Sequence, residues 1–207
     1  MSGGAPREPR IIDWGWAGSA LDGTDSGDLH VVAPFEGGAL IGLVDGLGHG
    51  PEAAAAARAA VLALEAHAGE SVLALIARCD DALRKRRGAV VSIASFHVRD
   101  ASLTWIGVGN VDGVLLRARR RRERPDEGLL VRGGVVGYQL PPLRATALPV
   151  EPGDLLVLNT DGVRPGFTEG LAREDPPQEI AESILARHAT GLDDAHVVVA
   201  RLLPRSQ

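Results

Sequence analysis

Residues 39–52 read Ala-Leu-Ile-Gly-Leu-Val-Asp-Gly-Leu-Gly-His-Gly-Pro-Glu and contain three successive kinds of local structure. The run 39–44 is almost continuously apolar, which is typical of a buried strand. A turn signal at 36–38 separates it from the β-type run 29–33, so the two runs predict a hairpin. Pro51 and Glu52 suit the first turn of a helix. Asp45 and Gly46 are therefore expected between a buried strand and a helix.

The elements on either side extend this pattern into an α+β domain. Helices are predicted at 51–67 and 70–86, with Gly88 ending the second, and at about 176–188. Strands are predicted at 89–98, 103–108, 113–118, 154–159 and 195–203. Short turns join neighbouring strands, so the sheets should be largely antiparallel, with helices layered beside them. This pattern leaves open whether there is one sheet or two.

Length and composition limit the possible classes of protein. The 207 residues fit one domain, expected at 10–207 after a polar, frayed segment 1–9. A net charge of −5 gives no electrostatic footprint for nucleic acid. No apolar run approaches the roughly 18 residues that span a bilayer, and the N-terminus does not resemble a signal peptide. The single cysteine, Cys79, excludes an internal disulfide framework. These features predict a cytoplasmic protein.

Aspartates recur where strands begin or end. Asp28 stands directly before a strand, Asp45 and Asp161 each end an apolar run and precede a glycine, and Asp193 and Asp194 precede the last strand. An ionised carboxylate at the end of a buried strand is costly unless something compensates its charge. Each Asp-Gly pair taken alone is usually a turn. The set as a whole favours a site where several carboxylates meet.

Carboxylate and carbonyl oxygens favour a particular kind of ligand. Mg²⁺ and Mn²⁺ prefer such hard oxygen donors, and glycine beside an aspartate allows the backbone to approach a metal or phosphate closely. Two such ions about 3.5–4 Å apart can activate a water molecule and hold phosphoryl oxygens for in-line attack. The aspartates therefore suit a site for divalent metal ions, although their spacing alone does not establish that they converge.

The same residues resemble a known family. The segment 45–50 with Glu52 and the alanine-rich helix is similar to the signature of the bacterial SpoIIE-type phosphatases, which are type 2C metal-dependent protein phosphatases. Three further motifs occur in the family's order: Ser26-Gly27-Asp28, Thr160-Asp161-Gly162, and Asp193-Asp194 before a valine-rich strand. Within the family the resemblance is closer to the short stressosome phosphatases, and it includes segments 76–82, 85–93, 107–111, 137–138 and 153–154.

The resemblance implies a fold, an activity and a set of site residues. The implied fold is a four-layer αββα sandwich of two antiparallel sheets, with two Mn²⁺ or Mg²⁺ ions at one edge. Asp45 would bridge both ions, the Gly46 carbonyl would bind one, and Asp161 and Asp193 would hold the other. Asp28 would act at the edge of the site, directly or through water, and Asp194 could be mistaken for the true ligand. The implied substrates are phosphoserine or phosphothreonine forms of STAS-domain stressosome or anti-sigma-antagonist proteins.

The sequence also departs from its relatives. Leu47 stands where animal type 2C enzymes carry a histidine proposed as general acid, and His196 stands where many relatives carry threonine. No basic residue matches the phosphate-binding arginine of the animal enzymes, so the general acid and the phosphate anchor are unassigned. Two alternative functions stay open. One is a catalytically idle binding module, and the other is a hydrolase of small phosphoesters.

Several other residues have structural interpretations. We expect His49 to belong to a turn, His196 to be structural, and Cys79 to pack in the core. Asn110 either orders a turn near the site or only forms one. Trp14, Trp16 and Trp105 are expected in the core or on a sheet surface, and the arginine-rich run 119–124 at a solvated hairpin tip.

The segment 163–177 has little apolar periodicity and directly follows Asp161. A loop of this length inside a compact domain is either functional or a passive surface connection. Our hypothesis is that it lies beside the metal site and controls access of a protein substrate without supplying ligands. On this hypothesis, shortening it between Arg164 and Arg173 should weaken action on a phosphoprotein and spare a small aryl phosphate.

Overall fold

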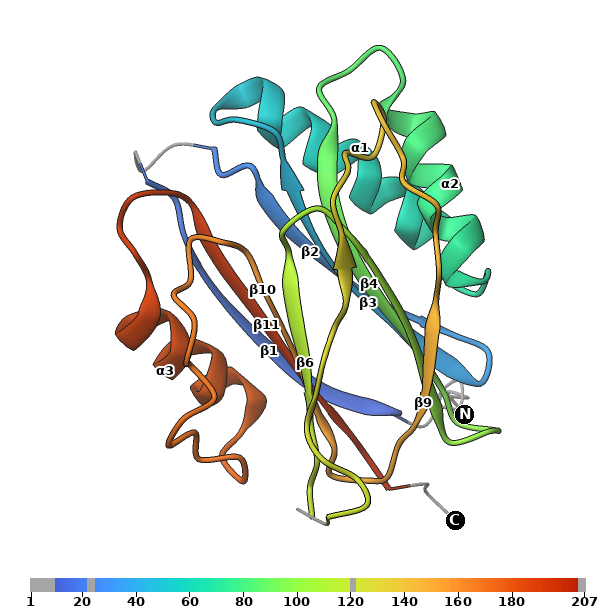
Figure 1. The fold of residues 1–207 in the computed structure, drawn as a ribbon, viewed down its shortest axis with the longest axis vertical. Helices are drawn as coiled ribbons and strands as arrows, with labels where there is room; N and C mark the ends of the chain where they lie inside the picture. The colour runs from blue at the N-terminus through green and yellow to red at the C-terminus, as the bar shows by residue number, and fades with distance from the viewer. Residues whose placement is uncertain (1–9, 22–24, 120–121, 205–207) are drawn as a thin grey trace, which may run out of the picture.

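Two β-sheets pack face to face, and helices cover both outer faces, in the computed structural model of the chain (Figure 1). The structure describes residues 10–21, 25–119 and 122–204, so the predicted frayed segment 1–9 lies outside the described residues. The first sheet has the order β1-β11-β10-β6-β7 and the second β2-β3-β4-β5-β8, with β9 also paired to β5. Among the described strands, β5 and β8 run parallel and the other named pairs run antiparallel. This is the predicted α+β class with two sheets.

The elements follow the predicted order closely. The first sheet contains β1 (Ile12–Ser19), β6 (Asp112–Leu116), β7 (Glu127–Gly128), β10 (Leu155–Asn159) and β11 (Ala195–Leu202). The second contains β2 (Asp28–Phe35), β3 (Gly38–Gly46), β4 (Ala89–His97), β5 (Ser102–Val108), β8 (Val131–Arg132) and β9 (Thr146–Pro149). The helices are α1 (Pro51–Ala66), α2 (Val72–Leu83) and α3 (Pro177–His188). The short strands β7, β8 and β9 were not predicted, because two to four residues carry too little periodicity. No bounds were predicted for β1, where only Trp14 and Trp16 were expected in the core or on a sheet surface.

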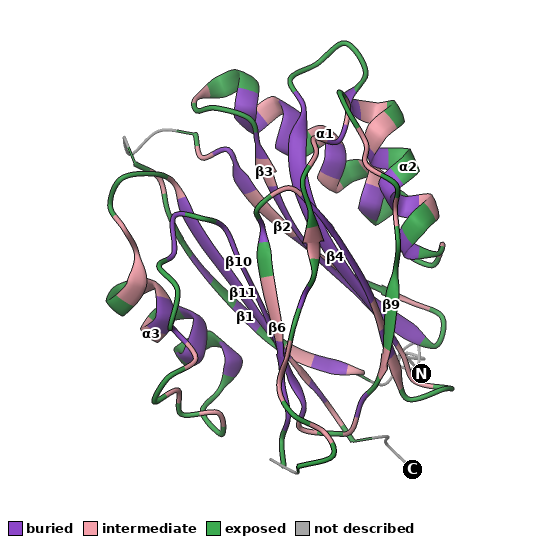
Figure 2. Ribbon diagram, viewed as in Figure 1, coloured by how far each residue is buried: buried purple, intermediate pink, exposed green. Residues whose placement is uncertain are grey.

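Three apolar interfaces hold the four layers together, and buried residues follow them in Figure 2. One lies between α1, α2 and the second sheet, and it includes Leu40, Leu64 and Cys79. The middle interface joins the two sheets and includes Trp105, as predicted for that tryptophan. The third lies between the first sheet and α3. The central strands β3, β4 and β10 are buried almost throughout their length, which explains their nearly continuous apolar runs.

Close packing of α1 depends on its small residues. Five alanines of α1 are buried against the second sheet, so the helix backbone comes close to the strands. A Cβ atom added to Gly46 would lie only 2.2 Å from the carbonyl oxygen of Ala53. The helix begins at Pro51, as the sequence predicted, and its N-cap is Gly50. Glycine and alanine are therefore needed where β3 passes the start of α1.

The predicted end of the second helix was wrong. This helix begins after Ser71, whose side chain accepts a hydrogen bond from the Ala74 amide, and it ends at Leu83, well before Gly88. Lys85 adopts a φ of 66°, which directs the chain away from the helix axis. Gly88 is required for packing instead, because a Cβ atom there would lie 2.3 Å from Val135 Cγ1.

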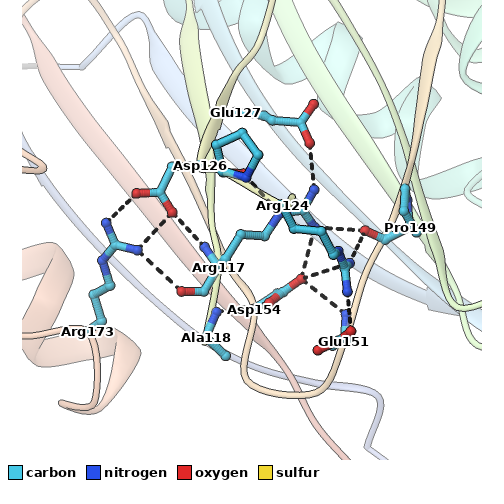
Figure 3. A network of polar contacts seen from close by, with 10 residues as sticks. Arg117, Ala118, Arg124, Asp126, Glu127, Pro149, Glu151, Asp154 and Arg173 are labelled. Carbon is cyan, nitrogen blue, oxygen red and sulfur yellow. Dashed lines mark hydrogen bonds and ion pairs between the residues drawn. The ribbon is translucent and has the colours of Figure 1, made fainter. Parts of the chain in front are cut away.

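A buried arginine lies between the sheets at the C-terminal end of β6 (Figure 3). The Arg117 side chain is 3% exposed and donates to Asp154, Glu127 and the Pro149 carbonyl at 3.0, 2.6 and 2.7 Å. Arg124 pairs with Glu151 and donates to the Pro149 carbonyl. The solvated-tip prediction was therefore wrong for Arg124, because acidic partners from distant segments surround it; residues 120–121 of that run lie outside the described residues.

Candidate active site

Asp28 and Asp45 face each other across the hairpin of β2 and β3. Their Cα atoms are direct partners in the antiparallel register. Asp28 is only 3% exposed, and its Oδ2 accepts a hydrogen bond of 2.8 Å from Thr160 Oγ1. Asp28 is therefore buried at this edge, and one of its carboxylate oxygens is hydrogen-bonded to Thr160, which follows β10 of the other sheet.

Thr160 connects the two sheets at this edge. Its hydroxyl donates to Asp28, on the second sheet, and accepts from the His196 amide at 2.9 Å. The Thr160 amide donates to the His196 carbonyl at 3.1 Å. Asp161 is the next residue, so these bonds fix the point at which its backbone leaves β10. The two strand-end aspartates 28 and 161 are thereby brought to the same edge.

The backbone after Asp45 is held from two sides. The Gly46 amide donates to the Gly27 carbonyl and the Leu47 amide to the Gly88 carbonyl, both at 3.0 Å. Gly48 and Gly50 adopt φ values of 85° and 80°, which glycine tolerates without strain. His49 is exposed within this turn. The glycines allow the chain to turn from β3 into α1 within four residues.

Asp193 and Asp194 have different surroundings. Asp194 accepts hydrogen bonds from the Leu21 amide, Ser26 Oγ and the Gly27 amide at 2.8, 3.0 and 2.8 Å. Both of its carboxylate oxygens therefore hold the segment that leads to Asp28. Asp193 is exposed and accepts from the Asp194 amide. This arrangement favours Asp193 over Asp194 as a ligand, as the resemblance implied.

The aspartates raise one another's pKa values. Burial, followed by the charge of Asp45, raises the pKa of Asp28 to about 8. Burial, followed by the charges of Asp161 and Asp193, raises the pKa of Asp45 to about 7. The pKa of Asp161 is raised by burial and by Asp193. Carboxylates with this behaviour are close enough to repel one another and lack a compensating positive charge.

The residues present fit a divalent cation by their chemistry. Within the described ranges, no group of three or more His, Cys, Asp or Glu side chains is close enough to enclose a metal ion. The donors at this edge are carboxylates and backbone carbonyls, which suit Mg²⁺ or Mn²⁺. The assignment of individual ligands stays a prediction.

His196 forms a buried cluster beside this edge. It is 5% exposed, stacks on Trp16 with ring centroids 5.1 Å apart, and its Nε2 lies 2.9 Å from His30 Nδ1. Burial, followed by the charge of His30, lowers the pKa of His196 to about 3. The structural interpretation of His196 is confirmed, and Trp14 and Trp16 lie partly exposed on the sheet surface as expected.

Acid should destabilise the protein through His196. The unfolded chain binds a proton at His196 below about pH 6.5, whereas the folded chain does so only near pH 3, so stability falls as pH falls below 6.5. Urea unfolding at pH 7.5 and at pH 5.5 measures the effect. Over this range we expect the unfolding free energy of wild type to fall by about 1 kcal/mol more than that of His196→Gln. A matched His67→Gln variant should behave like wild type. Equal losses in wild type and His196→Gln would contradict the assignment.

Two site-edge residues were missed or left undecided by sequence reasoning. Asn110 Nδ2 donates to Asp161 Oδ2 at 2.6 Å, so this asparagine does more than form a turn. Arg87 pairs with Glu52 at 2.7 Å and donates to the Leu47 carbonyl at 3.3 Å, which places a cation beside the turn after Asp45. Arg87 lies in the segment 85–93 that the resemblance included, but no local pattern distinguished it from its basic neighbours.

The segment 163–177 does not behave as an open flap over the site. Only its start adjoins Asp161, and it then runs alongside α3 (Figure 1). Val163 and Phe167 are buried in the interface with α3, and Arg173 pairs with Asp126 at 2.5 Å. The interpretation as a surface connection therefore fits better. Shortening the loop would remove these anchors, so it would not test substrate access cleanly.

Solved structures define the class of this fold. A structure of RsbX in complex with magnesium has a TM-score of 0.81 at 23% identity, covering 95% of this chain and 98% of that one. The SiaA-PP2C domain of Pseudomonas aeruginosa has a TM-score of 0.75 at 21% identity, covering 91% and 85%. A third similar chain comes from a structure of the bacterial stressosome, described as a modular system adapted to control secondary messenger signalling. It has a TM-score of 0.83 at 27% identity, covering 93% of this chain and 100% of that one. The chain has the type 2C phosphatase fold.

Sequence comparison identifies the family within this class. The profile of the family Stage II sporulation protein E (SpoIIE) matches residues 36–203. The chain belongs to the SpoIIE family. It is 26% identical over 164 residues to the phosphoserine phosphatase RsbX of Bacillus subtilis (strain 168), covering 79% of this chain and 80% of that protein. Family and fold place the chain among the protein serine/threonine phosphatases. No helix of the described residues is long and apolar enough to cross a membrane.

Proposed function

We propose that this protein is a metal-dependent phosphatase that removes phosphate from phosphoserine or phosphothreonine of STAS-domain stressosome or anti-sigma-antagonist proteins in the cytoplasm. The observation that carries the chemistry is the meeting of strand-end aspartates from both sheets at one edge, where Thr160 joins them. The support for the substrate class is the similarity to RsbX, a phosphoserine phosphatase, and to the stressosome chain.

In this proposal each site residue has a distinct task. Asp45, the Gly46 carbonyl, Asp161 and Asp193 would hold two Mn²⁺ or Mg²⁺ ions, and Asp28 would act at the edge of the site, directly or through water. When bound, such ions polarise the phosphoryl group and lower the pKa of a water molecule. The glycine-rich turn after Asp45 leaves room for the phosphate to approach, because no side chain other than His49 and Leu47 projects from it.

Metal removal should abolish turnover. Because the proposed ligands are all oxygen atoms, treatment with EDTA followed by dialysis should reduce hydrolysis of a phosphorylated STAS protein at least about 100-fold, and Mn²⁺ or Mg²⁺ should restore it. The measurement is phosphate release in metal-free buffer with and without added ion. Full activity of the metal-free protein would contradict the proposal.

The same assay separates the alternative functions. A phosphatase of proteins should act much faster on the phosphorylated STAS protein than on free phosphoserine. Faster hydrolysis of free phosphoserine would favour a small-phosphoester hydrolase. Binding of the phosphoprotein without turnover, with metal present, would favour an idle binding module.

A further inference from the structure

Asn110 contacts one of the proposed metal ligands directly. Its side-chain amide donates to Asp161 Oδ2 at 2.6 Å. This hydrogen bond orients the Asp161 carboxylate. The amide is uncharged, so it leaves the negative charge of the carboxylate available to a cation, whereas a lysine or arginine in this place would neutralise it.

The turn that carries Asn110 is held on both sides. The Gly109 amide donates to the Arg132 carbonyl at 2.8 Å, and the buried Ser92 hydroxyl donates to the Val111 carbonyl at 2.6 Å. Gly109 adopts a φ of 101°, and a Cβ atom there would lie 2.1 Å from Val90 Cγ1. These contacts restrict the backbone on both sides of Asn110, so the position of its side-chain amide is well defined. Such rigidity suits a residue that orients another side chain.

The position of the turn explains why Asn110 reaches Asp161. The turn joins β5 of the second sheet to β6 of the first, and β6 pairs with β10, where Asp112 lies opposite Asn159. Asp161 follows β10 by two residues. A side chain just before β6 is thus next to the end of β10 as a result of strand pairing.

We propose that Asn110 is a positioning residue that holds the Asp161 carboxylate in the orientation needed to bind a divalent cation. The inference rests on the proposed function, in which Asp161 is a ligand. Loss of a hydrogen-bonding partner behind a metal ligand commonly weakens metal binding by about 10–100-fold. Asn110 itself need not touch the ion or the substrate.

The test measures Mn²⁺ binding without any substrate. Wild type, Asn110→Ala and the near-isosteric Asn110→Leu are titrated with Mn²⁺ by calorimetry, with Gln139→Ala as an exposed amide deletion elsewhere. We expect both Asn110 variants to bind at least about tenfold more weakly and Gln139→Ala to match wild type. Thermal melts of the metal-free proteins check folding, and the two Asn110 variants should both melt cooperatively.

Asp161→Asn separates this inference from the proposed function. If Asp161→Asn loses Mn²⁺ binding while both Asn110 variants bind within about twofold of wild type, Asp161 is a ligand and the inference about Asn110 is wrong. If Asp161→Asn binds as well as wild type, the ligand assignment fails and the inference falls with it. Weaker binding in Asn110→Ala and Asn110→Leu, together with loss in Asp161→Asn, supports both.

Discussion

Asp45→Asn should reduce turnover by at least about 1,000-fold, which corresponds to a barrier higher by roughly 4 kcal/mol. The amide keeps the size of the carboxylate but removes the negative charge that would bridge two cations. Phosphate release from a phosphorylated STAS protein at saturating Mn²⁺ measures the loss. Activity within about tenfold of wild type would show that Asp45 is not the bridging ligand.

The same substitution should stabilise the metal-free protein. Burial and the charges of Asp161, Asp193 and Asp194 raise the pKa of Asp45 from 3.8 to about 7, so ionising it in the folded state is unfavourable. Stability of wild type therefore falls as pH rises from about 4 to 7, whereas the uncharged asparagine avoids this loss. At pH 8 we expect the metal-free variant to be more stable by about 1–3 kcal/mol, or several degrees in melting temperature.

Two comparisons make this result specific to the site. Near pH 4 the carboxyl group is protonated in the folded state and roughly half protonated in the unfolded state, so most of the stability difference between variant and wild type should disappear. Asp81→Asn, an exposed change at the end of α2, should alter neither activity nor the pH dependence of stability. A stabilisation that persists unchanged at pH 4 would mean that charge repulsion is not its cause.

Arg117→Met should destabilise the fold by about 3–5 kcal/mol, because it removes the nearest cation from the buried carboxylate of Asp154. Asp154, also 3% exposed at its side chain, would keep backbone donors from Ala118 and Glu151 but lose the guanidinium at 3.0 Å (Figure 3). Equilibrium urea unfolding measures the cost. The network joins β6 to the start of β10, whereas the aspartates meet where β10 ends, so activity of the folded variant at low temperature should be retained.

The double variant Arg117→Met with Asp154→Asn tests the cause. Removing the stranded charge should recover part of the lost stability, and the coupling between the two changes measures the pair. The exposed neighbour Arg119→Met serves as the control and should cost less than about 0.5 kcal/mol. A cost below about 1 kcal/mol for Arg117→Met would show that solvent reaches this network.

Local patterns in the sequence were sufficient to predict the order of strands and helices. Alternating or continuous apolar runs mark strands, alanine-rich spacing marks α1, and Gly-Pro at 50–51 marks its start, because each of these preferences acts over a few residues. The same locality explains the errors. Gly88 looked like a helix end, yet the helix ended at Leu83, and glycine at 88 is required by Val135, a residue distant in sequence.

The sequence alone also indicated which aspartates to consider, since each is at a strand end and several adjoin glycine. What the tertiary structure decided was how they are supported. Thr160 reaches Asp28 across 132 positions, Asn110 reaches Asp161 across 51, and Asp194 holds the segment before Asp28. Arg124 looked like part of a solvated charge run, but in the folded chain it pairs with Glu151, a residue distant in sequence. Hydrogen bonds and ion pairs of this kind depend on which strands pair and which sheets pack, and no local preference encodes that.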